Sequence, residues 1–119
     1  MRAKRTNPEF LNGVPELVIL RLLAGRPMYG YELVQAIRQS SGRALEFGEG
    51  CIYPILHRLK NEAVLSSRRE KVGGRSRVVY RVTKAGRKRL AGSTRQWRQV
   101  VEAVTRVLEG GCHGQPSVA

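Results

Sequence analysis

The chain has 119 residues, which suits one domain with a modest core, and its hydrophobic content of 41% excludes a wholly disordered chain. Its 22 Lys and Arg residues against nine Glu give a formal net charge of +13, which indicates a polyanionic partner, either nucleic acid or an anionic membrane. No apolar run is long enough for a transmembrane helix and no signal peptide is recognisable, so we expect no membrane partner and a cytoplasmic location with thiol cysteines.

Two helices are predicted near the start of the chain, after a loose basic arm over residues 1–9. The first runs from Pro15 to Gly25, because proline suits a first helical turn and glycine a helix end. The second covers residues 31–42 and has its apolar side chains on one stripe. "RPMYG", between the two, is expected to be a connector. "RALEFGEG", which follows them, is either a loop or a short extended piece around Leu45 and Phe47.

The segment "GEGCIYPILHRLKNEAVL" predicts a third helix with two different faces. At about 100° per residue, one stripe is apolar, and it consists of Ile52, Ile55, Leu56 and Leu59. The opposite face carries no acid and suits base edges and phosphates; it comprises Gly50, Pro54, His57 and Asn61, flanked by Tyr53 and Arg58. Because proline lacks an N–H, the helix is expected to begin near Gly50 or Cys51. The alternative is that this face is merely solvated.

A basic β-hairpin is predicted after the third helix. From Val64 the hydrophobic period changes to two, and "VLSSRREKV" and "RVVYRVT" are joined by "GGRS". Residues 68–89 hold ten Lys and Arg against a single Glu, and the hairpin is expected to carry Arg75 and Arg77 to its tip. Arginine at such a tip can enter a narrow minor groove or bind phosphates. The alternative is a charged edge strand that resists aggregation.

A last helix is predicted over residues 84–109, with Thr83 as its N-cap. It has a heptad-like apolar seam formed by Leu90, Trp97, Val101, Val104 and Leu108. So long an apolar surface has no obvious partner in a small domain, so we expect a two-fold homodimer through this helix. Trp97 has two interpretations, interface core or a stacking surface for a flat apolar effector.

The order of elements predicts a mainly α protein with a small β hairpin, a winged helix-turn-helix. Its DNA-binding domain is expected over residues 10–83, followed by a dimerisation helix over 84–109 and a disordered tail over 110–119. The third helix is expected in the major groove of double-stranded DNA, with the hairpin as a wing along the backbone. Cys112 and His113 in the tail do not make a metal site by themselves.

The chain resembles the PadR family of bacterial transcriptional regulators. The resemblance rests on "ELVILRLLAGRPMYGYEL" (16–33), "GEGCIYPILHRLKNEAVL" (48–65) and "RVVYRVTKAGRKRL" (77–90), and it covers roughly 10–109. It implies a homodimeric winged-helix repressor of a pseudo-palindromic operator. Short members have a single C-terminal helix for dimerisation, and some members release DNA when they bind phenolics or planar drugs.

The resemblance also implies roles for individual residues. Tyr53 and Pro54 match the family's Tyr-Pro in the recognition helix, and Arg75 and Arg77 match its basic wing. The remaining correspondences are a phosphate contact at Tyr29 and, in drug-binding members, a pore-lining tryptophan at Trp97.

Two residues depart from the family's pattern. Cys51 stands where the family usually has Ser or Thr, a better cap and phosphate donor. Ala63 stands where it usually has Gly after the recognition helix. If that position is left-handed, alanine costs about 1 kcal/mol there.

Other functions fit the same residues less well. An enzyme is not expected, because the chain has no Asp, two His and no phosphate-binding Gly-rich loop, and no cofactor is implied. The main alternative is a basic protein that binds DNA or RNA without sequence preference. A protein-interaction adaptor would leave the charges of residues 68–89 without a use.

Overall fold

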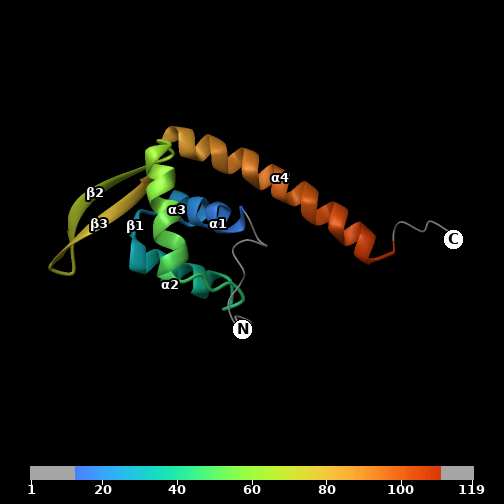
Figure 1. Ribbon diagram of the computed structural model, residues 1–119, viewed down its shortest axis with the longest axis horizontal. Coiled ribbons are helices and arrows are strands. Elements are labelled where there is room, and N and C mark those ends of the chain that lie inside the picture. Colours follow the sequence, from blue (N-terminus) through green and yellow to red (C-terminus); the bar gives the residue numbers. More distant parts are fainter. Residues whose placement is uncertain (1–12, 111–119) are drawn as a thin grey trace.

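The computed structural model describes residues 13–110, which form four helices and a three-stranded sheet (Figure 1). In chain order the elements are α1 (Val14–Gly25), β1 (Met28–Tyr29), α2 (Gly30–Ser40), α3 (Glu49–Asn61), β2 (Leu65–Val72), β3 (Arg75–Val82) and α4 (Lys84–Leu108). The sheet is antiparallel in the order β1-β3-β2. With α2 and α3 as the helix pair and β2–β3 as the wing, the predicted winged helix-turn-helix is confirmed. The basic arm at 1–9 and the tail from residue 111 lie outside the described residues.

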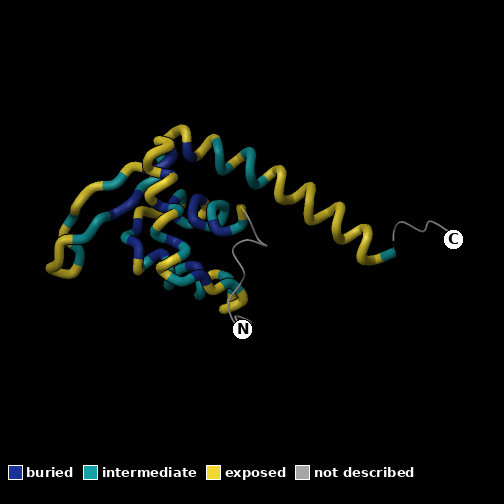
Figure 2. Tube along the Cα trace, viewed as in Figure 1, coloured by how far each residue is buried: buried dark blue, intermediate teal, exposed yellow. Residues whose placement is uncertain are grey.

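The hydrophobic core lies among α1, α2, α3 and the base of the wing (Figure 2). Its largest fully buried side chains are Ile19, Leu20, Leu33, Ile37, Ile52, Leu56, Leu59 and Leu65. They recur at helical spacing within each helix, and each such burial stabilises the fold by roughly 1.5–3 kcal/mol. The core therefore fixes which face of α3 points to solvent.

The end of α3 turns sharply into β2 at Ala63. Ala63 has φ 63°, in the left-handed region. The N–H of Val64 donates to the carbonyl oxygen of Leu59 (3.0 Å) and the N–H of Ala63 to that of Lys60 (3.0 Å), which is a Schellman motif. Ala63 is therefore left-handed, the conformation in which alanine costs about 1 kcal/mol relative to glycine.

The start of α4 is attached to this turn. The predicted N-cap is confirmed, since the Gly86 N–H donates to Thr83 Oγ1 (3.1 Å). The Thr83 hydroxyl donates to the Ala63 carbonyl oxygen (2.7 Å), and a Cβ on Gly86 would overlap the Val64 carbonyl. The first turn of α4 is thus tied to the end of α3.

One connecting segment differs from the sequence prediction, and a second decides between two alternatives that the sequence left open. "RPMYG" contains β1, where Met28 and Tyr29 pair with Tyr80 and Val79 of β3. A two-residue strand is too short to show a period of two, so its pairing depends on tertiary contact. "RALEFGEG" forms no strand; Phe47 is buried in the core without strand pairing.

The start of α3 also differs from the prediction. The helix begins at Glu49 with Gly48 as N-cap, so Gly50 and Cys51 are already helical and Pro54 lies inside the helix. The helix thus begins one residue before the expected start near Gly50 or Cys51, and Pro54 is its sixth residue. The missing N–H of Pro54 deprives the Gly50 carbonyl of its helical donor, and because Gly50 is exposed, water can take that place.

Candidate nucleic-acid interface

The outward face of α3 is the surface that the sequence predicted. Its four members, Gly50, Pro54, His57 and Asn61, are all exposed, whereas Ile52, Leu56 and Leu59 on the opposite side are fully buried. Lys60, which the sequence reading did not single out, is also exposed. It lies seven residues after Tyr53, two helical turns on the same side, and this spacing could have identified it.

Arg58, expected to flank this face, is held in a ring of four charges. Its guanidinium pairs with Glu16 of α1 (2.9 Å) and with Glu62 (3.4 Å), and Arg89 of α4 pairs with Glu62 (2.7 Å) and Glu16 (3.5 Å). The hydrogen bond to Glu16 raises the pKa of Arg58, and the bond from Arg89 lowers the pKa of Glu62. The structure thus directs Arg58 toward α1 and α4, a placement that its helical position alone did not indicate.

Tyr53, on the other flank, is half-buried and packs against the start of α2. A Cβ on Gly30 would overlap the ring and hydroxyl of Tyr53, so the two residues are in close contact. Burial and the charge of Glu49 raise the pKa of Tyr53, and the charge of Arg77 lowers it. Tyr53 therefore fixes α3 against its neighbours and is less outward than the sequence suggested.

The wing ends in a two-residue turn. Val72 pairs with Arg75, and Gly73 and Gly74 between them have φ 61° and 80°, positive values that favour glycine at both turn positions. Arg75 is exposed at the tip, as predicted. Arg77 is not at the tip, because "GG" alone forms the turn that the sequence reading extended to "GGRS". Its guanidinium carbon lies 4.4 Å from the ring centroid of Tyr29.

The two remaining DNA-contact candidates are both half-buried. Tyr29 is the residue before α2, and its N–H donates to Glu32 Oε1 (3.4 Å). Cys51 is the third residue of α3, and its N–H donates to the Gly48 carbonyl oxygen (3.0 Å), so the cap position belongs to Gly48. With Gly50 and Pro54 it lines a hollow of about 670 Å³ against the N-terminus of α1.

The C-terminal half of α4 is exposed on nearly all sides (Figure 2). Its large apolar side chains are exposed by 40–78%, and they are Trp97, Val100, Val101, Val104, Val107 and Leu108. Leu90, the first member of the predicted seam, is half-buried against the core. The exposed part of the seam therefore begins at Trp97. This part, which consists of Trp97, Val101, Val104 and Leu108, is called the α4 stripe below.

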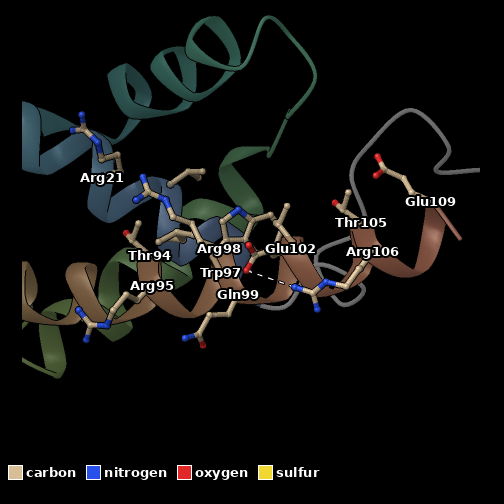
Figure 3. Close-up of a pocket in the computed structure, with 13 residues that line it drawn as sticks. Arg21, Thr94, Arg95, Trp97, Arg98, Gln99, Glu102, Thr105, Arg106 and Glu109 are labelled. Atoms are coloured by element: carbon tan, nitrogen blue, oxygen red, sulfur yellow. Dashed lines mark ion pairs between the residues drawn. The ribbon is translucent and has the colours of Figure 1, made fainter. Parts of the chain in front are cut away.

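A hollow of about 1020 Å³ lies between α1 and α4. Trp97 and Val101 line it from α4, and Leu17 and Val18 line it from α1. Arg98 extends from α4 toward α1 beside Trp97, as Figure 3 shows. The hollow is open and part apolar, part cationic. Within residues 13–110 there is neither a helix able to cross a membrane nor a cluster of three or more His, Cys, Asp or Glu suited to a metal.

Known proteins are similar to this chain in sequence and in architecture. The transcriptional regulator PadR-like family matches residues 19–92. Transcriptional regulator Rv3488 of Mycobacterium tuberculosis is 36% identical over 105 residues, which cover 88% of this chain and 92% of that protein.

Solved structures agree with these sequence matches. A PadR-like transcriptional regulator from Bacillus cereus superposes with a TM-score of 0.74 at 29% identity, covering 84% of this chain and 96% of that one. A PadR family transcriptional regulator from Eggerthella lenta gives a TM-score of 0.73 at 28% identity, with 85% and 87% covered. The chain therefore belongs to the PadR-like family of transcriptional regulators, whose members are not enzymes.

Proposed function

We propose that the protein is a cytoplasmic, homodimeric repressor that binds a pseudo-palindromic DNA operator. The observation that supports this most is the exposed face of α3 beside a wing whose tip carries Arg75. A helix with such a face fits the major groove, and a wing can follow the backbone. Two copies joined through the α4 stripe would present two such helices to two half-sites.

The chemistry of the face supports a division of roles. His57 and Asn61 carry hydrogen-bonding groups suited to base edges, and Gly50 and Pro54 allow close approach. Lys60 has no acidic partner within residues 13–110, so its charge is available for phosphates. Arg75, at the wing tip, likewise has no acidic partner among the described residues, so its charge is also available for phosphates.

Selection from random DNA duplexes tests this function. We expect enrichment of one palindrome, bound at least ~10³-fold more tightly than a scrambled duplex at the same salt. His57→Ala and Asn61→Ala should relax the preference at defined positions of the site. Lys88→Ala, on the exposed side of α4, is the matched control and should leave the preference unchanged. Binding without an enriched sequence would support the sequence-independent alternative.

The hollow between α1 and α4 supports a second proposal, release of DNA by a small planar aromatic effector. Its volume suits a drug-sized molecule, and Trp97 offers a stacking surface. Trp97 is the single tryptophan of the chain, so its fluorescence reports this position alone. A ligand that releases DNA should also change Trp97 emission; release without such a change would leave Trp97 as interface core.

A further inference from the structure

Arg77 lies where three elements of the DNA-binding domain meet. Tyr29 of β1 pairs with Val79 of β3, so Arg77, two residues along β3, is its diagonal neighbour on the same face of the sheet. The guanidinium carbon is 4.4 Å from the centre of the Tyr29 ring. A cation at this distance over an aromatic face is attracted by the ring. The stack joins the wing to the residue that precedes α2.

Among the described residues, no carboxylate forms an ion pair with Arg77. Glu70 is its partner in the strand register, yet Glu70 Oε2 pairs with Arg81 (2.5 Å) and Arg68 (3.6 Å). Within the described residues, Arg77 Nε is buried and has no hydrogen-bond acceptor. The contact with the Tyr29 ring is thus the one that the structure gives the Arg77 guanidinium. If the side chain left the ring, the guanidinium would become exposed to solvent.

The recognition helix meets the same cluster through Tyr53. The Tyr53 ring lies against Gly30, the residue after Tyr29, and the charge of Arg77 acts on the Tyr53 hydroxyl. Tyr29, Gly30, Tyr53 and Arg77 will be called the joint. These residues belong to β1, α2, α3 and the wing, so the joint connects α3 with the wing.

We infer that Arg77 is a positioning residue for DNA recognition, which holds the wing and α3 in the relative orientation that matches the operator, and is not a phosphate contact. This inference rests on the proposed function, because it needs a specific operator. A phosphate contact acts on every sequence and contributes to the salt slope. A positioning residue acts on the alignment of α3 with base edges, so its loss lowers the ratio of operator to scrambled-duplex affinity.

Two arginines two residues apart provide the test. Arg75→Ala and Arg77→Ala are compared in full-length protein, with operator and scrambled duplex titrated over a range of salt and the active fraction fixed by stoichiometric titration. For Arg77→Ala we expect the affinity ratio to fall by about tenfold or more, as for one lost base contact, with the salt slope unchanged. For Arg75→Ala we expect the ratio to hold and the slope to fall by about 1.8, that is by about 0.9 for each of the two protomers.

Variants of the stack separate charge from geometry. Arg77→Lys keeps the charge but replaces the planar guanidinium above the Tyr29 ring with a flexible ammonium, so it should behave like Arg77→Ala. Tyr29→Phe keeps the ring and removes only the hydroxyl, so the affinity ratio should hold, whereas Tyr29→Leu should lower the ratio. The Tyr29 pair also serves if Arg77 variants fold poorly, which thermal unfolding reveals.

Several results would overturn the inference. One is a lower salt slope with an unchanged ratio in Arg77→Ala; another is restoration of wild-type binding by Arg77→Lys. If the wild type has an affinity ratio of ~10³ and Tyr29→Leu keeps it, the positioning role is contradicted while the proposed function stands. A wild-type ratio near one would instead overturn the proposed function and, with it, the inference.

Discussion

Two helix ends meet the same backbone requirement with different residues. At the end of α2, Gly42 has φ 62°, and the Gly42 and Arg43 N–H groups bond back to Gln39 and Arg38. At the end of α3, Ala63 occupies the equivalent position with φ 63°. A side chain in this region crowds the backbone, and glycine avoids the crowding. Ala63 is therefore held in place by its surroundings at a cost to stability.

Replacing Ala63 with glycine should stabilise the protein. Relief of the left-handed conformation outweighs the extra freedom of glycine in the unfolded chain, and we expect a net gain of about 1 kcal/mol. The converse change, Gly42→Ala, should cost about the same. The space around Gly42 is open, so the penalty comes from the left-handed backbone conformation. Urea unfolding at one protein concentration measures both. Changes of the same sign in the two variants would contradict this account.

Gly30 is constrained for a different reason. Its backbone is helical, but a Cβ would overlap the Tyr53 ring, so Gly30→Ala should destabilise the protein by about 1–3 kcal/mol through overpacking. Gly50→Ala is the matched control in α3, because nothing lies near that position and alanine favours a helix interior. We expect Gly50→Ala to be neutral or stabilising in the same unfolding assay. Equal losses in both variants would argue against the Tyr53 contact.

At the scale of elements, the predictable features are those carried by neighbouring residues. Pro15, Gly25 and Thr83 act at helix ends as the sequence indicated, and the 3.6-residue period assigned the exposed face of α3 correctly. Contacts between distant residues were missed. Arg58 pairs with a residue 42 positions away, and Arg89 with one 73 positions away, so no local pattern encodes the ring they form with Glu16 and Glu62.

The ring of charges ties α1, α3 and α4 together, and its stability should depend on pH. The bond from Arg89, followed by that from Arg58, lowers the pKa of Glu62 in the folded protein. As the pH falls, the unfolded chain therefore takes up this proton first. The contribution of Glu62 is present above its unfolded pKa of about 4.3 and is lost as the pH falls through its folded pKa.

Glu62→Gln measures this contribution. We expect the variant to be less stable than the wild type at neutral pH, and the difference to shrink as the pH is lowered below about 5. Urea unfolding at a series of pH values gives both curves. In an Arg89→Met background, which removes the main partner, Glu62→Gln should change the pH dependence less. A difference between wild type and Glu62→Gln that stays constant with pH would contradict the ring's role.

At the scale of the whole molecule, the polar and apolar surfaces are separated. The exposed face of α3 and the wing lie on the compact part of the protein, whereas α4 extends away from it (Figure 1) and carries the exposed α4 stripe. Because Thr83 and Gly86 hold the start of α4 against the end of α3, the direction of α4 is set relative to α3. A dimer through α4 would thereby fix the spacing of two recognition helices.

Val104→Glu tests this arrangement where it should matter most. Val104 is 51% exposed in one chain, so a glutamate there should leave the fold intact while placing a charge in the centre of a paired stripe. We expect sedimentation equilibrium to show a monomer, with circular dichroism close to the wild type. Gln99→Glu introduces the same charge about 140° around the helix and should remain a dimer.

Loss of the dimer should change DNA binding in a characteristic way. The monomer should keep its affinity for a single half-site, because α3 and the wing are untouched. It should lose at least ~100-fold in affinity for the full palindrome, since the second half-site no longer binds at a high effective concentration. If Val104→Glu is monomeric but binds the operator with full affinity, the spacing of the two recognition helices is not set by α4. A variant that stays dimeric would show that the pairing surface lies elsewhere on the chain.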